Sequence, residues 1–364
     1  MRGSVFVLVV LIASLAYGED DFRPLIWRVS DKDSSIYLLG SVHVLRSQDY
    51  PIPRLLNFVY ESTEHLVLET TFDHVSADEY WDFMHEGAFY PYGQSLEDIM
   101  TPTQQEKLES FLATQDFPYE PRYRPWFYLY HIIGMVAYDE SVFNKEGVDD
   151  YFKLWAEGGL KPISGLEDWR DPIRIVRAEY QSIPEREAVD FIEFIIDNPE
   201  YYHEGAIEII ELWKTGDLNQ VEARLIEDDG PKYDEDPLLK DRNLNWMPEI
   251  KGYLESNADA FIVVGAAHLP GDWGLLNLLA AEGFELTPLP EEPWVEMEIQ
   301  NINFRPQLVV NGTFGQIIHV EFCNDPILDS WSMYNVLILD EDPSYVPLSW
   351  DSGTVFFRAV TVEE

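Results

Sequence analysis

Cysteine is almost missing from this sequence of 364 residues, in which Cys323 is the single one. A disulfide within the chain is therefore excluded. A zinc site built from thiolates is excluded as well, because structural zinc usually takes two to four cysteines. The chain must owe its stability to a hydrophobic core and not to covalent bridges.

Basic residues are also scarce. The 24 Lys and Arg residues stand against 67 Asp and Glu residues, so the formal net charge is −43 and the isoelectric point is near 4.2. Such a surface repels phosphate groups, which excludes the usual electrostatic binding to nucleic acids and to anionic lipid heads. The apolar fraction of 46% is nevertheless typical of folded soluble proteins, and the length allows two domains.

Several common enzyme motifs are absent too. The sequence contains no Gly-x-Ser-x-Gly elbow, which excludes the standard serine hydrolase. It contains no Walker loop and no Gly-x-Gly-x-x-Gly turn. His85-Glu86 lacks the second histidine of the helical zinc-protease motif, so we interpret it as a solvated helix end.

The longest apolar run lies at the amino terminus. Arg2 precedes an apolar run over residues 5–16, and Ala16-Tyr17-Gly18 places small residues before an acidic stretch. This pattern predicts a signal peptide over residues 1–18 and a secreted or periplasmic protein. An uncleaved membrane anchor is the alternative, although the run is shorter than the roughly 20 residues of a spanning helix. After cleavage the sequence predicts no membrane span.

Short apolar runs further along predict the strands of a sheet. The run at 36–40 is continuously apolar, as expected for a buried strand of a parallel sheet, and residues 65–69 are predicted to form a further buried strand. The helical spacing over 53–64 between them predicts a strand–helix–strand unit. Helices dominate the middle of the chain. Residues 19–290 are therefore predicted to form an α/β core with a mixed, mostly parallel sheet and a large helical middle section. The other predicted strands are 25–29, 261–265 and 284–289, and 161–167 returns briefly to the sheet.

A run of prolines over residues 288–293 predicts a domain boundary. Beyond it, Asn311-Gly312 lies between two β-type runs, 307–310 and 313–322, which predicts a hairpin. We therefore expect residues 291–364 to form a small all-β module.

Two similar motifs follow two of the predicted strands. Gly40-Ser41-Val42-His43 and Gly265-Ala266-Ala267-His268 each place a glycine at the strand end and a histidine three residues later, and Glu69 follows a third strand. The glycines lack a Cβ, so a ligand can approach the backbone closely. Two imidazoles and a carboxylate at the carboxyl edge of a sheet form a minimal divalent-metal set, with open positions for water and substrate. The alternative is structural: both histidines hydrogen-bond to the backbone, and Glu69 forms an ion pair.

These ordered motifs resemble the TraB/PrgY/GumN family, which includes the Tiki proteins, described as metal-dependent proteases that clip the amino terminus of Wnt. The resemblance extends over residues 24–290. It implies an α/β fold related to the erythromycin-esterase and ChaN-like proteins, while the β module has no counterpart that we recognise in the family. Further matching segments are Arg124-Pro125-Trp126, Gly147-Val148-Asp149, Gly165-Leu166-Glu167 and Arg242-Asn243.

The resemblance also implies roles for individual residues. His43, Glu69 and His268 would be the metal or catalytic group, with Mn²⁺, Co²⁺ or Zn²⁺ as the ion. Arg242 would be a catalytic cation that binds a substrate carboxylate or an oxyanion. Second-tier binding residues are Gly40, Gly265, Glu167 and Asn243.

Three hypotheses for function follow. The first is an exported metal-dependent hydrolase with a peptide or peptide-like substrate, in which Glu69 is the general base if it is not a ligand. The second is a protein that binds a peptide or small molecule in the same cleft without cleaving it. The third assigns the biological role to the β module, as an adhesion or interaction domain. The sequence predicts no particular oligomeric state.

Overall fold

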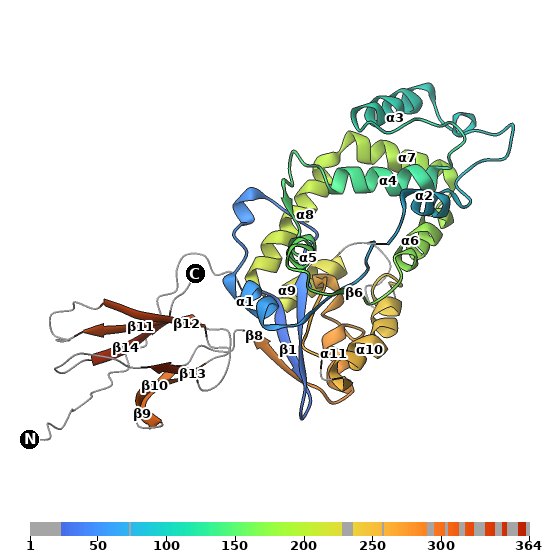
Figure 1. Ribbon diagram of the computed structural model, residues 1–364. Helices are drawn as coiled ribbons and strands as arrows, with labels where there is room; N and C mark the ends of the chain where they lie inside the picture. Colours follow the sequence, from blue (N-terminus) through green and yellow to red (C-terminus); the bar gives the residue numbers. More distant parts are fainter. Residues whose placement is uncertain are drawn as a thin grey trace, which may run out of the picture.

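Figure 1 shows a computed structural model of the chain. It describes residues 23–72, 74–227, 236–256 and 258–289, together with six strands between residues 295 and 361. The predicted signal peptide lies outside the described residues. Within them, no helix combines the length and the apolar character that crossing a bilayer requires.

A six-stranded sheet organises the first 289 residues. Its strand order is β6-β4-β7-β2-β1-β8, with parallel pairs from β6 to β2 and antiparallel pairs on both sides of β1. Five strands thus run in one direction and β1 runs against them, which confirms the predicted mixed, mostly parallel sheet. The strands are β1 (Ile26–Ser30), β2 (Ser35–Ser41), β4 (His65–Leu68), β6 (Ile163–Gly165), β7 (Ala260–Gly265) and β8 (Glu285–Leu289).

The predicted strand–helix–strand unit is present as β2, α1 (Arg54–Ser62) and β4. Its two strands are parallel but not adjacent, because β7 lies between them. Every residue of β7 is buried, as the continuous apolar sequence requires. The register pairs Ser41 with Gly265, so the two glycine–histidine motifs begin side by side.

Within the described residues, ten further α-helices follow α1. Two of them begin where the sequence predicts: the Ser76 hydroxyl accepts from the Glu79 amide at 3.1 Å, and Thr101 and Gln104 form a capping box. The helices are α2 (Ala77–His85), α3 (Pro102–Thr114), α4 (Pro125–Ala137), α5 (Val148–Gly159), α6 (Arg170–Ser182), α7 (Glu185–Asp197), α8 (Pro199–Thr215), α9 (Leu218–Glu227), α10 (Lys240–Glu255) and α11 (Leu275–Ala281).

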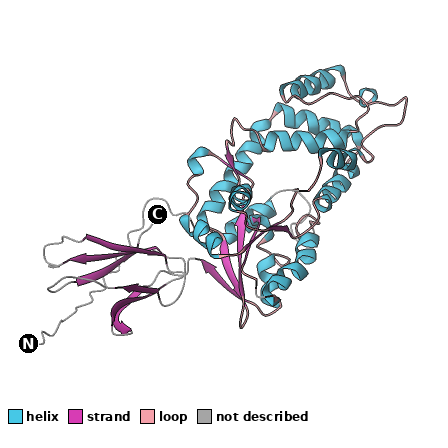
Figure 2. Cartoon of the chain, viewed as in Figure 1, coloured by secondary structure: helices cyan, strands magenta, loops and turns pink. Residues whose placement is uncertain are grey.

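The helices divide between the sheet and a separate helical lobe (Figure 2). The core around the sheet takes buried side chains from α1, α5 and α8 to α11. In the lobe, α3, α4 and α7 share one apolar cluster, and α2, α4 and α6 share a second one rich in aromatic rings. One contact ties α8 directly to the first motif, since the buried Trp213 indole donates to the carbonyl of Gly40 at 2.8 Å.

Beyond residue 289 the described elements are all strands. They form two three-stranded sheets, β13-β10-β9 and β12-β11-β14, in which every pair is antiparallel. The hairpin predicted at Asn311-Gly312 is wrong: both residues end β10, where they pair with Glu296 and Val295, and β11 belongs to the other sheet. Cross-strand pairing has overridden the local turn preference. The strands are β9 (Val295–Ile302), β10 (Arg305–Gly312), β11 (Ile317–Cys323), β12 (Ser332–Ile338), β13 (Ser344–Pro347) and β14 (Phe356–Thr361).

The connecting segments of this region lie outside the described residues. The all-β module and its boundary therefore stay predictions.

Candidate functional site

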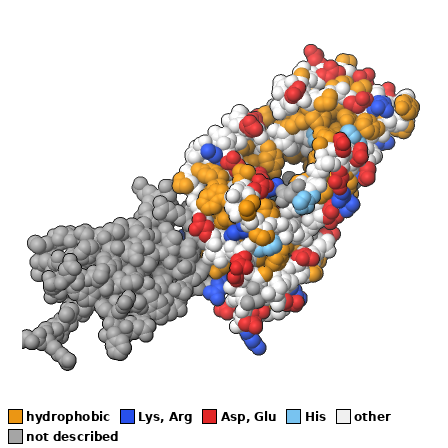
Figure 3. Space-filling view, viewed as in Figure 1, with side chains coloured by type: hydrophobic (Ala, Val, Ile, Leu, Met, Phe, Trp, Pro, Cys, Tyr) orange, Lys and Arg blue, Asp and Glu red, His pale blue; other side chains and the backbone are white. Residues whose placement is uncertain are grey.

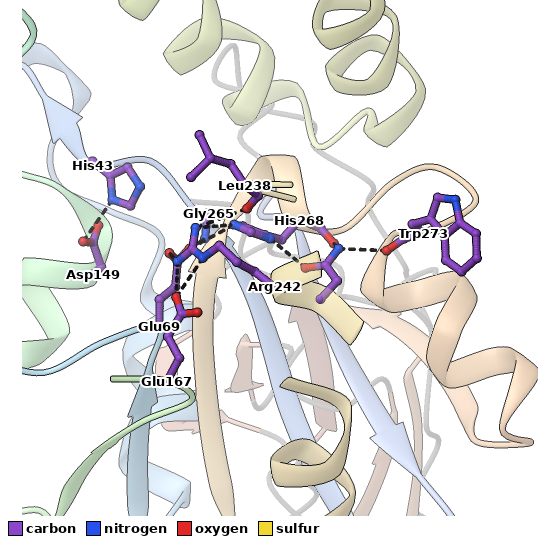
Figure 4. Close-up of polar contacts among 10 residues, drawn as sticks. His43, Glu69, Asp149, Glu167, Leu238, Arg242, Gly265, His268 and Trp273 are labelled. Atoms are coloured by element: carbon purple, nitrogen blue, oxygen red, sulfur yellow. Dashed lines mark hydrogen bonds and ion pairs between the residues drawn. The ribbon is translucent and has the colours of Figure 1, made fainter. Parts of the chain in front are cut away.

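The predicted site residues meet at the carboxyl edge of the sheet (Figure 4). Glu69 directly follows β4, Glu167 follows β6, and His43 follows β2. His268 ends a short 3₁₀ turn (Ala266–His268) after β7, while Arg242 and Asn243 lie in the first turns of α10. Parallel strands end at the same edge of a sheet, which explains why residues so far apart in sequence come together.

The two motif glycines have different surroundings. A Cβ on Gly265 would lie 3.3 Å from Glu69 Oε1, 3.6 Å from His43 Nε2 and 3.7 Å from His268 Cδ2. The bare backbone of Gly265 thus lies at the point where three functional side chains converge. A Cβ on Gly40 would instead lie 2.6 Å from Leu269 Cδ1, so the missing side chain there allows the two motifs to pack together.

Arg242 lies at the centre of a buried ion-pair network. Its Nη2 donates to Glu69 Oε2 at 2.6 Å, and its Nε donates to Glu167 Oε1 at 2.7 Å. Its Nη1 lies 3.4 Å from the carbonyl of Leu238, and the guanidinium lies 4.7 Å from the ring centre of Trp246. With 7% of its surface exposed and its donors engaged, Arg242 holds the two carboxylates in place.

Glu69 is strongly stabilised as a carboxylate. Burial alone raises the pKa of a carboxyl group, but the charges of His268, Arg242 and His43 oppose this effect, and the amide of Gly265 donates to Oε1 at 2.6 Å. The net result lowers the pKa of Glu69 to about 2. Glu167 differs, because burial outweighs the attraction of Arg242 and raises the pKa of its carboxyl group.

His268 is held as a neutral ring in one tautomer. Asn243 Nδ2 donates to the carbonyls of His268 and Trp273, at 3.1 and 2.8 Å, which fixes the amide orientation. Asn243 Oδ1 must then accept the Nδ1 proton of His268, at 2.7 Å. The lone pair of Nε2 remains, and Arg242 Nη1 approaches it at 3.3 Å. Burial is the main reason that the pKa of His268 falls to about 4.

His43 has a different partner, which the sequence did not reveal. Its Nδ1 donates to Asp149 Oδ2 at 3.1 Å, and this carboxylate is the main cause that raises the pKa of His43 to about 9. The start of α5 lies directly on the motif: the amide of Val148 donates to the carbonyl of Val42 at 2.9 Å, and a Cβ on Gly147 would collide with the backbone of His43. Gly147-Val148-Asp149 matched the family in sequence, but nothing in that pattern indicated a partner for His43.

The site is open on the His43 side. The exposed fraction of the side chain falls from 50% for His43 to 17% for Glu69 and 4% for His268. The space-filling view is hollowed between the sheet and the helical lobe, with apolar side chains along the rim (Figure 3). Solvent therefore reaches the site on the His43 side, and His268 lies at its floor.

The model of the TraB/PrgY/GumN family matches residues 25–288. The chain belongs to the TraB/PrgY/GumN family. This match covers the sheet and the helical lobe and includes both glycine–histidine motifs. No curated protein and no solved structure matches the chain.

The donor chemistry of this family member suits a divalent cation. The Nδ1 atom of each motif histidine contacts a hydrogen-bond acceptor, Asp149 for His43 and Asn243 for His268, which is the arrangement that orients metal-binding imidazoles. Glu69 supplies an oxygen beside both rings. Across the part of the chain that the structure describes, no three His, Cys, Asp or Glu side chains are grouped as a formed metal centre. The residues thus fit an ion by chemistry, and binding would require them to draw closer.

Proposed function

We propose that this TraB/PrgY/GumN protein is a hydrolase that cleaves amide bonds in peptides or peptide-like molecules. The observation that carries the proposal is the convergence of Glu69, His43 and His268 on the bare backbone of Gly265. A substrate carbonyl can approach a glycine backbone that no side chain covers. The half-exposed side chain of His43 shows that the site is open to solvent on that side.

Each residue has a distinct role in this proposal. Glu69 is ionised at neutral pH and accepts a hydrogen bond from the attacking water. His43, which Asp149 keeps protonated, donates a proton to the leaving nitrogen from the exposed side of the site. Arg242 has no donor left for a substrate carboxylate, so we assign it a positioning role in place of the catalytic one implied by resemblance.

An alternative form of the proposal has a divalent ion, Mn²⁺, Co²⁺ or Zn²⁺, held by His43, Glu69 and His268; His43 would then bind in its neutral form and would not be the proton donor. Such an ion would polarise the carbonyl and lower the pKa of water. A test that does not depend on activity is the metal content of the purified chain, compared among wild type, His43→Ala, His268→Ala and the control His65→Ala. His65 is the first residue of β4, at the opposite end of that strand from Glu69, and it hydrogen-bonds to Ser164. Replacing it should therefore leave the site intact. Equal metal content in all four proteins would remove the ion from the proposal.

Export is a further part of the proposal and rests on residues 1–18. The amino-terminal sequence of the mature protein, recovered from the medium or the periplasm of an expressing cell, tests it. We expect the mature chain to begin at Glu19. A chain that keeps Met1 and stays in the cytoplasm would contradict export.

A binding protein without catalysis is the second candidate, and the closed ion-pair network favours it. Arg242, Glu69, Glu167 and His268 already satisfy much of one another's hydrogen-bonding capacity. A binder needs only the open face at His43, whereas a hydrolase must present reactive groups to the substrate.

A digest of a random decapeptide library separates the two candidates. We expect wild type and His65→Ala to generate new amino termini, and Glu69→Gln to lose at least about 100-fold of the rate, the usual contribution of a general base. Parallel digests with Mn²⁺ and with a chelator report the role of the ion. Peptides that bind to the protein but are not cut would support the second candidate, a binding protein without catalysis. Equal cleavage by Glu69→Gln and wild type would refute the assigned site.

A further inference from the structure

A ladder of aromatic rings leads from the site into the helical lobe. The ring of Phe72 lies 5.7 Å from that of Trp169, which lies 5.9 Å from Tyr80; Tyr80 in turn lies 5.4 Å from Trp81. Trp81 also contacts His131 of α4 at 5.7 Å. These five rings, which we call the aromatic ladder, join α2, α4 and the start of α6 without a break.

Two rings of the ladder are unusually exposed. Phe72 is 44% exposed and Trp81 is 37% exposed, whereas Trp169, against which Phe72 packs, is 5% exposed. An exposed ring held against a buried one is a fixed apolar surface and not a loose side chain. Exposed aromatic surface of this kind is typical of ligand sites.

The ladder begins at the two site carboxylates. Phe72 follows Glu69 by three residues, and Trp169 follows Glu167 by two. Three peptide units span at most about 11 Å between the Cα atoms of Glu69 and Phe72. An extended peptide advances about 3.3 Å per residue, so Phe72 lies within reach of a side chain up to about three residues from the bond at Glu69.

We propose that Phe72, packed against Trp169, forms a specificity subsite for a large apolar or aromatic side chain of an extended, basic peptide substrate, and that Trp81 continues this apolar surface farther from the bond. This inference rests on the proposed peptide hydrolase. Continuity with the site argues for a segment of the substrate itself, because a separate partner would have no reason to bind beside the two carboxylates. The net charge of −43 favours a substrate segment that carries Lys or Arg, since long-range attraction increases the encounter rate with cationic peptides.

The test is the sequence preference of cleavage in the decapeptide library. For wild type we expect enrichment of Phe, Tyr, Trp or Leu at one position within three residues of the cut, with Lys or Arg more frequent than Asp or Glu nearby. Phe72→Ala should lower this enrichment by about tenfold, the discrimination that a modest apolar contact provides, and Trp81→Ala, farther along the ladder, should lower it less. Cleavage of peptides with Ala at that position should be unchanged.

Tyr92→Ala is the matched control, because Tyr92 is an aromatic residue of the same lobe that is 94% exposed. We expect it to keep the wild-type preference. All three variants should keep a cooperative thermal melt, although Phe72→Ala and Trp81→Ala remove partly buried ring contacts and should melt below wild type. An unchanged preference in both ladder variants would overturn the subsite while leaving the hydrolase intact. Absence of any cleavage by wild type would instead refute the proposed function. If oligosaccharides protect Trp81 from oxidation and peptides do not, the ladder is a glycan surface and the inference is wrong.

Discussion

Replacing Asn243 with alanine removes the amide that orients His268 at the floor of the site. Asn243 is 2% exposed and makes three hydrogen bonds, to the carbonyls of His268 and Trp273 and from the His268 ring. The variant leaves the buried carbonyl of His268, the partly buried carbonyl of Trp273 and the ring N–H of His268 without these partners. Each such loss costs about 1–3 kcal/mol, so we expect a loss of at least about 3 kcal/mol in the free energy of unfolding.

Urea unfolding followed by tryptophan fluorescence measures this loss, and a thermal melt should show a decrease of about 6–12 °C. Asn198→Ala is the control, because its exposed amide makes one hydrogen bond, to the carbonyl of Phe194, and should cost less than about 0.5 kcal/mol. Asn243→Asp should lower the free energy of unfolding more than Asn243→Ala does, since a carboxylate would face two carbonyl oxygens. If Asn243→Ala costs less than about 1 kcal/mol, or if the Asp variant is as stable as wild type, the tautomer assigned to His268 is wrong.

Three more predictions address other parts of the molecule. Asp149→Asn should lower the pKa of His43 from about 9 towards its ordinary value of 6.5, as measured by NMR titration of the ring, and a pKa that stays near 9 would contradict the pairing. Burial lowers the pKa of His131 to about 4, so the unfolded chain takes up a proton between about pH 6.5 and pH 4 that the folded chain excludes. His131 should therefore contribute a loss of about 3 kcal/mol in stability across this window, beside the similar contribution of His268, and in urea unfolding the decrease for His131→Phe should be smaller than that for wild type by this amount. Gly265→Ala should abolish library cleavage with little loss of stability, because its methyl group would enter the site. Gly40→Ala should instead lower the free energy of unfolding in urea by about 1–3 kcal/mol, because its methyl group would collide with Leu269. The reverse pattern would refute the roles assigned to the two glycines.

Much of the sheet was predictable from local sequence. Short apolar runs mark the buried strands β2, β4 and β7. The repeated glycine–histidine spacing marks the carboxyl ends of β2 and β7. The placement of His43 and His268 at one edge followed from the parallel arrangement alone.

The remaining features depend on contacts that leave no local pattern. Asp149 looks like an ordinary acidic residue at a helix start, and its role appears only because Gly147 allows α5 to lie on the backbone of His43. The enclosure of Arg242 by two carboxylates, from β4 and β6, likewise depends on how α10 packs over the sheet. Asn311-Gly312 has the strongest local turn signal in the chain, yet both residues pair across strands, because ladder contacts outweighed that signal.

The two motifs show how identical spacing can produce opposite chemistry. His43 and His268 each follow a strand and a glycine, and each directs Nε2 towards Glu69. The partner of Nδ1 separates them: a carboxylate stabilises the charged ring of His43 at the solvent edge, whereas an amide stabilises the neutral ring of His268 in the interior. A charged ring can donate a proton, and a neutral ring offers a lone pair, so the site holds both capacities at neutral pH on either side of one carboxylate. Because the difference resides in Asp149 and Asn243 and not in the motifs, exchanging the motif sequences should leave the two pKa values where they are.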